Sequence, residues 1–139
     1  MNIRSDIAQG DGSDRGQLAA LARFELRNRE RRTRLIRYDV FADPAWDMLL
    51  DLYVRHGENE PAHVSALCGT AGVALTTALR WIGLLMELEL IVQTPVGGES
   101  REPHVTLTQR GIDEMERYLR DILERERIGS DVAARPPRG

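Results

Sequence analysis

Residues 72–91 read GVALTTALRWIGLLMELELI, and this stretch decides the fold. Ala78, Ile82 and Leu85 recur at helical spacing, which predicts an amphipathic helix over about 74–88. The outer side of that helix mixes apolar, hydroxyl and basic side chains: Leu75, Thr76, Leu79, Arg80 and Gly83. Such a face suits contact with nucleic acid or with protein, so the surrounding sequence has to decide between these partners.

The residues before this helix predict two further helices. Segment 63–73 reads HVSALCGTAGV, in which Val64 and Leu67 precede glycines at 69 and 72. Small residues permit a tight turn, so we expect a short helix that crosses closely with the next one. Upstream, Asp43 can cap a longer helix and Pro44 suits its first turn; apolar residues then follow at i, i+3, i+4 and i+7, namely Trp46, Leu49, Leu50 and Tyr53.

The residues after this helix predict a β-hairpin and a last helix. LIVQTP (90–95) and PHVTLT (103–108) have the composition of short strands, and the glycine-containing VGGESRE (96–102) joins them. The hairpin loop is expected over about 95–103. Thr108 can cap a final helix to about Arg127. Its apolar stripe follows at i, i+3, i+7 and i+10: Ile112, Met115, Leu119 and Ile122.

The order of these elements is typical of a winged helix-turn-helix. A further helix from about Arg15 to the low thirties, with Leu18 and Leu21 on its apolar side, completes a mainly α (α+β) architecture. In that architecture a two-stranded β-hairpin forms the wing and helices flank it at both ends. We expect one domain over 15–128, with disordered tails at 1–14 and 129–139, where the sequence lacks periodicity.

Composition and charge narrow the class of protein. The 139 residues are 42% hydrophobic and 29% charged, and no apolar run approaches the length of a membrane span, so a cytoplasmic protein is expected. The net charge of −3 is unevenly spread. Residues 15–37 contain eight arginines and two glutamates, a net charge of +6, so the rest of the chain has a net charge of −9. This asymmetry indicates an anionic partner for one end, or a solvated helix face.

The quoted stretches also carry a family resemblance. LCGTAGVALTTALRWIGLLMELELI (67–91), ESRE (99–102) and VTLTQRG (105–111) resemble the winged-helix region of MarR-type bacterial regulators, over roughly Pro44 to Arg120. The resemblance implies a recognition helix in the major groove, a wing arginine in the minor groove and a homodimer built by the terminal helices. It places Thr76, Thr77, Leu79 and Arg80 at recognition-helix positions and Arg101 on the wing.

This chain departs from the family pattern at several places. The wing has Glu99, Ser100 and Arg101 where the family usually has an aspartate followed by two arginines. Glu89 stands where a glycine usually precedes the first wing strand. Only one C-terminal helix fits before the tail, whereas the family usually has two, so the dimer interface must be smaller or built differently.

We therefore predict a sequence-specific, DNA-binding transcriptional regulator that binds double-stranded DNA as a homodimer. The predicted DNA contacts are Leu75, Thr76, Thr77, Leu79, Arg80 and Arg101, and the predicted dimer contacts are Leu18, Leu21, Ile112, Met115, Leu119 and Ile122. The alternative is a protein-interaction module that binds its partner through Leu75, Leu79 and Met86. A small aromatic effector near Trp46 and Tyr53 is a further interpretation.

Other chemistry has little support in the sequence. We expect no enzyme activity, because no phosphate loop, nucleophile elbow or metal-binding helix pair is present. We also expect no cofactor and no metal, because the three histidines, His56, His63 and His104, are scattered along the chain. The single Cys68 could sense oxidants, but its position in the short helix favours a structural role.

Overall fold

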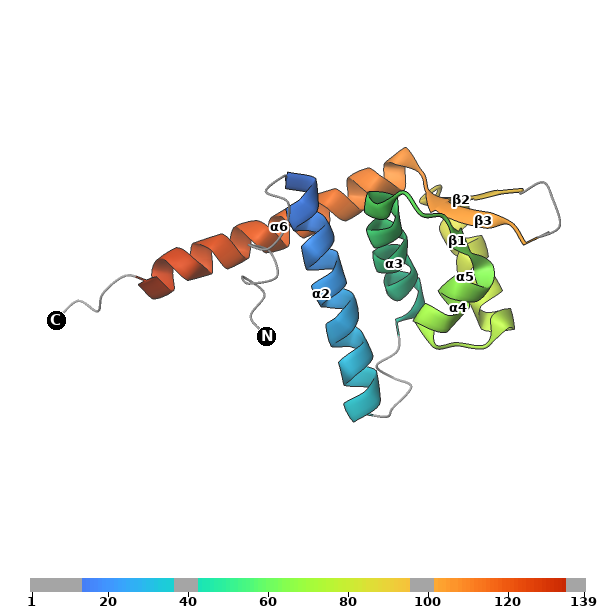
Figure 1. Cartoon of the computed structure of the whole chain (residues 1–139), viewed down its shortest axis with the longest axis horizontal. Helices are drawn as coiled ribbons and strands as arrows, with labels where there is room; N and C mark the ends of the chain where they lie inside the picture. Colours follow the sequence, from blue (N-terminus) through green and yellow to red (C-terminus); the bar gives the residue numbers. More distant parts are fainter. Residues whose placement is uncertain (1–13, 37–42, 96–101, 135–139) are drawn as a thin grey trace.

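The computed structural model describes residues 14–36, 43–95 and 102–134, with side chains described as far as residue 126 except that of Thr33. The elements follow in the order α2 (Asp14–Leu35), α3 (Pro44–Glu58), β1 (Ala62–His63), α4 (Val64–Ala71), α5 (Leu75–Glu87), β2 (Ile91–Thr94), β3 (His104–Leu107) and α6 (Gln109–Ala134). This is the predicted mainly α winged helix-turn-helix with helices at both ends (Figure 1).

Helix α3 is the centre of the molecule. It starts as predicted, because the Asp43 carboxylate accepts a hydrogen bond from the backbone N–H of Trp46 (3.3 Å) and Pro44 occupies the first turn. Figure 1 shows α3 between α2 on one side and the α4–α5 pair on the other, with α6 crossing at one end. Its buried residues include Met48, Leu50 and Leu52, which join a core fed by every helix. Helix α3 therefore contacts every other described helix and strand β3.

Helices α4 and α5 form the helix-turn-helix. Gly72 ends α4 in the left-handed conformation (φ 66°), and its N–H donates to the carbonyl groups of Cys68 and Gly69. The two helix axes are bent by 105° relative to each other, within the range of about 90–120° typical of this motif. The predicted turn is thus confirmed. Cys68 donates its S–H to the carbonyl oxygen of Val73 (2.9 Å) in this same turn, in agreement with a structural role.

The sheet has three antiparallel strands in the order β1-β3-β2. The two wing strands lie where the sequence predicts them, and Ile91, Val105 and Leu107 direct their side chains into the core. Strand β1 was not predicted. It has two residues, too few to show the alternation by which a strand is recognised in sequence.

The end of α5 places a non-glycine residue in a left-handed conformation. Glu89 has φ 61° and donates its N–H to Met86, while Leu90 donates to Leu85. These two bonds form a Schellman motif, whose left-handed position is usually glycine. The sequence departure at Glu89 therefore leaves the backbone geometry intact, although a side chain in this conformation costs free energy.

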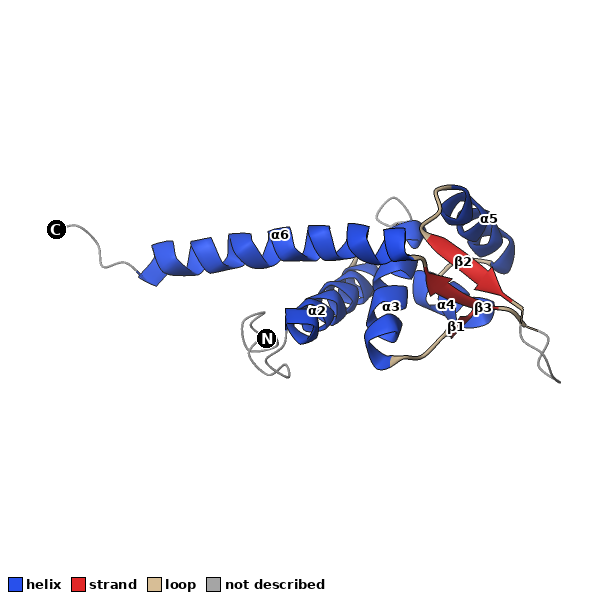
Figure 2. Ribbon diagram, turned by 90° about the horizontal axis from the view of Figure 1, so that it is seen from above, coloured by secondary structure: helices blue, strands red, loops and turns tan. Residues whose placement is uncertain are grey.

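Helix α6 begins at a tight junction and runs further than predicted. The Thr108 hydroxyl accepts from the backbone N–H of Gly111 (3.0 Å), which confirms the predicted cap. Gly111 lies against the Leu90 carbonyl: a Cβ there would stand 2.1 Å from that oxygen. The predicted end near Arg127 was wrong, because the helix continues to Ala134 and projects beyond α2 (Figure 2). Residues 1–13 and 135–139 of the predicted tails lie outside the described residues.

Two buried polar contacts tie α3 to its neighbours. Tyr53 donates its hydroxyl to Glu116 of α6 (2.9 Å), and burial together with this acidic partner raises the pKa of Tyr53 well above its ordinary value. Asp51 accepts from Thr70 of α4 (2.9 Å) and from Arg55 (3.1 Å). Satisfied polar groups of this kind fix the relative positions of helices, because a shift would leave a buried group without its partner.

Among the described residues, no single helix has both the length and the apolar composition to cross a membrane. Helices α4 and α5 together pass that test by length and composition alone, across the bend between them.

Candidate nucleic-acid interface

The outer face of α5 is open to solvent, as the sequence predicts. Ala78, Ile82 and Leu85 are buried beneath it and hold the helix on the core. The five predicted contact residues on this helix are all exposed: Leu75, Thr76, Thr77, Leu79 and Arg80. The structure thus brings together on one surface every predicted DNA-contact residue that it describes.

Helical spacing divides this face into a polar centre and two apolar edges. Thr76, Arg80 and Glu87 occupy the centre. Leu75 (55% exposed), Leu79 (46%) and Met86 (38%) line one edge. Leu84 and Leu88 line the other edge, and their exposure was not singled out from the sequence. Exposure of several neighbouring leucines to water is energetically unfavourable, so this face has the character of a binding surface.

Arg80 is the single basic residue of α5. It is exposed and has no ion-pair partner among the described residues. A guanidinium group presents N–H donors in a planar fork that fits a guanine edge or a phosphate. The hydroxyl groups of Thr76 and Thr77 add hydrogen-bonding groups on the same first turns of the helix.

The base of the wing is attached to the helix-turn-helix. Glu102 accepts a hydrogen bond from the backbone N–H of Ser65 in the first turn of α4 (2.7 Å), and this bond lowers the pKa of the Glu102 carboxyl. Glu102 was not singled out in the sequence. The predicted wing residue Arg101 lies outside the described residues.

The arginines of α2 serve more than one purpose. Arg23 pairs with Glu58 (3.0 Å) and Arg29 pairs with Asp47, so both tie α2 to α3. Arg31, Arg32 and Arg34 are exposed near the C-terminal end of the helix. Some arginines of α2 therefore stabilise its packing against α3, whereas the exposed arginines of its last turns are accessible to a partner.

The six predicted dimer contacts lie mainly inside the protomer. Leu18, Leu21 and Leu119 are fully buried, Met115 and Ile112 are almost so, and Ile122 packs at the edge of the same core. The helical spacing of these six residues therefore reflects their packing in the core of the protomer. Dimerisation through α2 and α6 stays a prediction, and exposed neighbours on these helices would have to make the contact.

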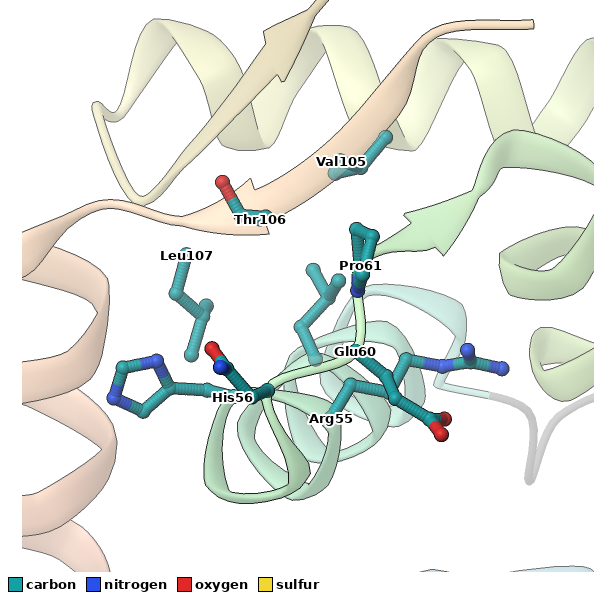
Figure 3. Close-up of a pocket in the computed structure, with 9 residues that line it drawn as sticks. Arg55, His56, Glu60, Pro61, Val105, Thr106 and Leu107 are labelled. Atoms are coloured by element: carbon teal, nitrogen blue, oxygen red, sulfur yellow. The ribbon is translucent and has the colours of Figure 1, made fainter. Parts of the chain in front are cut away.

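A small pocket of about 140 Å³ lies between the end of α3 and strand β3 (Figure 3). Leu52, Pro61 and Leu107 supply apolar lining, and Arg55 and His56 stand at its edge. The sequence-based interpretation placed an effector near Trp46 and Tyr53. Those side chains have other contacts: Trp46 packs edge-on against Tyr118 (4.9 Å between ring centres), and Tyr53 bonds to Glu116.

Comparison with known proteins identifies the fold. No family model and no curated protein matches the chain. Among solved structures, a mutant of Staphylococcus aureus MepR matches with TM-score 0.53 and 13% identity, over 84% of this chain and 80% of that one. A MarR family transcriptional regulator from Silicibacter pomeroyi matches with TM-score 0.49 and 16% identity, over 84% and 74%.

RV1404 from Mycobacterium tuberculosis matches with TM-score 0.49 and 25% identity, over 68% of this chain, which spans 60% of that structure. The element order, the helix-turn-helix and the wing define a winged-helix protein. Its fold is MarR-like, as the resemblance in the sequence implied.

Proposed function

We propose that this protein binds double-stranded DNA as a sequence-specific transcriptional regulator of MarR-like type. The observation that carries the proposal is the outer face of α5, where Thr76, Thr77 and Arg80 are exposed together on a helix anchored by its buried side. An α-helix fits the major groove, which is roughly 12 Å wide. The wing beside it extends the contact toward the neighbouring backbone.

Each residue of the face has a role in this proposal. Arg80 donates to a guanine edge or to phosphate, and the threonine hydroxyls bind phosphate or base edges. Leu75 and Leu79 contact thymine methyl groups. Arg101 contacts DNA from the wing, by the family resemblance alone. Arg31, Arg32 and Arg34 add the attraction to phosphate that the acidic wing lacks.

Assembly and regulation complete the proposal. The protein acts in the bacterial cytoplasm as a homodimer, with α6 among the contacting elements and each α5 in one half-site. A dimer would place the half-sites about 34 Å apart, one helical turn of DNA. The pocket between α3 and β3 is the described cavity that we assign to a small aromatic effector. No enzymatic step is part of this function.

The decisive experiment selects a binding sequence from random duplexes and then measures affinity over a salt series. Binding through several arginines should weaken steeply as salt rises. Arg80→Ala should cost roughly 1–3 kcal/mol and relax specificity at the contacted base pair. Arg117→Ala is the matched control for the loss of an exposed arginine, because Arg117 lies on α6 and pairs with Glu114; light scattering checks that this variant keeps the oligomeric state of the wild type. Equal affinity and specificity in both variants would remove Arg80 from the interface.

A second function is favoured by the apolar edges of the same helix. Exposed Leu75, Leu79 and Met86 would suit a protein partner, which is the alternative interpretation of the sequence. Such a contact would hardly respond to salt. Failure to enrich any duplex, together with salt-insensitive binding of a protein that Leu79→Asp abolishes, would replace the DNA proposal with this one.

A further inference from the structure

Folding brings together two histidines that are far apart in the sequence. Strand β1 pairs with β3 so that His63 stands directly opposite His104. Directly opposed side chains in an antiparallel pair lie on the same face of the sheet with their Cβ atoms about 5 Å apart. The ring centres of the two imidazoles are 4.6 Å apart at an interplanar angle of 70°. The scattered positions in the sequence gave no sign of this pair, because β1 was not predicted.

One ring nitrogen of the pair has no hydrogen-bond partner among the described residues. Nδ1 of His63 is buried and has no hydrogen-bond partner, the single such side-chain atom found among the described residues. A buried nitrogen without a partner is unfavourable and calls for a bound group. Both side chains are half-buried where the edge strand β1 pairs with the first residue of the central strand β3, so part of the pair is accessible to solvent.

Negative charge lies beside the pair. Glu102 is two residues before His104, and its carboxylate accepts a hydrogen bond from the backbone N–H of Ser65, two residues after His63 (2.7 Å). The described residues hold no group of three or more His, Cys, Asp or Glu side chains arranged as a metal site. An ion bound here would therefore have the two imidazoles as its protein ligands, with the charge of Glu102 nearby.

We propose that His63 and His104 together bind one divalent transition-metal ion, with Zn²⁺ as the representative, at the base of the wing. Imidazole nitrogen suits zinc and its neighbours in the first transition row. Two imidazoles on one zinc, each about 2.0–2.1 Å away, have ligand nitrogens about 3.3 Å apart in tetrahedral geometry. Ring centres lie further apart than the ligand nitrogens, so the observed 4.6 Å fits a shared ion.

Binding there would join two parts of the fold. Strand β1 leads directly into α4, and β3 is the central strand of the wing sheet (Figure 1). An ion held by both strands would stabilise the attachment of the wing to the helix-turn-helix. Since the ion binds only the folded arrangement, it should raise the thermal unfolding temperature.

The test is a Zn²⁺ titration of the full chain by calorimetry at pH 7.5. One ion should bind per chain, and His63→Gln and His104→Gln should each weaken binding at least about tenfold. His56→Gln is the matched control, because His56 lies at the end of α3, where its ring stands beside Tyr53 (6.4 Å between ring centres), and is not a member of the pair. The Zn²⁺ affinity of this variant should stay within about twofold of that of the wild type. Circular dichroism confirms that each variant folds.

A second measurement does not depend on the variants. In wild-type protein labelled at its histidine rings, Zn²⁺ should shift the NMR signals of His63 and His104 and leave those of His56 unchanged. Absence of binding, or equal loss with His56→Gln, would overturn the proposal. Neither result bears on DNA binding, so the two proposals stand or fall separately.

Discussion

Helices α5 and α6 are both amphipathic, but their solvent-facing sides differ in kind. The outer side of α6 carries ion pairs at helical spacing, such as Arg117 with Glu114 and Arg125 with Asp121. The outer side of α5 carries exposed leucines around Arg80 and Glu87. Paired charges are what a helix facing water usually shows, whereas an exposed apolar rim around an arginine with no ion-pair partner in the described part of the chain is not. The contrast is the reason why we assign the DNA contact to α5 and not to α6.

The strongest way to break this contrast is to disturb the junction where α6 begins. Gly111→Ala would place a methyl group 2.1 Å from the Leu90 carbonyl, a contact that only a backbone shift can relieve. We expect a loss of stability of about 3 kcal/mol or more, together with loss of DNA binding because the end of α5 moves. Urea unfolding monitored by circular dichroism measures the first effect and a gel shift the second.

Gly83→Ala provides the matched control, since a Cβ at Gly83 meets no atom within 4 Å. That variant should be as stable as the wild type or slightly more so, because alanine favours the helix. If Gly111→Ala were as stable as Gly83→Ala, the contact with Leu90 would not govern position 111.

A smaller effect is expected from loosening α6 without changing its path. Tyr53→Phe removes the hydroxyl that satisfies the buried carboxylate of Glu116. Leaving that group without its partner should lower the free energy of unfolding by about 1–3 kcal/mol. Affinity of the folded protein for DNA should be unchanged, because the α5 face is untouched.

Tyr118→Phe serves as the control for the loss of a tyrosine hydroxyl, since Tyr118 is 41% exposed and its ring still packs on Trp46. Chemical denaturation of both variants checks the difference. If Tyr53→Phe weakened DNA binding at a temperature where the variant is fully folded, the packing of α6 would affect the DNA contact of α5. The two helices would then not have separate roles.

The smallest effect sharpens the contrast at the end of α5. Glu89→Gly removes the conformational cost of a non-glycine residue at φ 61°. It also removes the exposed ion pair between Glu89 and Arg110 (3.3 Å), which contributes little. The protein should gain about 1 kcal/mol of stability with no change in DNA affinity. Thermal unfolding is a sufficient measurement, and Arg110→Ala isolates the ion pair. Destabilisation by Glu89→Gly would show that the carboxylate does more than pair with Arg110.

Local signals in the sequence predicted most of the fold. Asp43 with Pro44, Gly72 and Thr108 mark helix ends by mechanisms that act within a few residues, and each is confirmed. Strand β1 and the extension of α6 past Arg127 were missed. The former exists only through its pairing with β3, and the latter crosses Gly129, which reads locally as a breaker.

The candidate site was predictable to a lesser degree. Exposure of Thr76 and Arg80 followed from helical periodicity, because the buried side was evident. Periodicity does not say what covers an apolar stripe, so Leu18 and Leu119 were assigned to a dimer although they fill the protomer core. Their proposed role in dimerisation is not settled by this burial. The opposition of His63 and His104 depends on strand register, which no short-range pattern records.

The Leu90 carbonyl accepts the backbone N–H of Thr108 (3.0 Å) and rests against Gly111. The same peptide group therefore follows the end of α5 and contacts the first turn of α6. We therefore expect that a change in the direction of α6 would tilt α5, because both helices are attached at this peptide group. In the proposed homodimer, the direction of each α6 would accordingly set the distance between the two α5 helices.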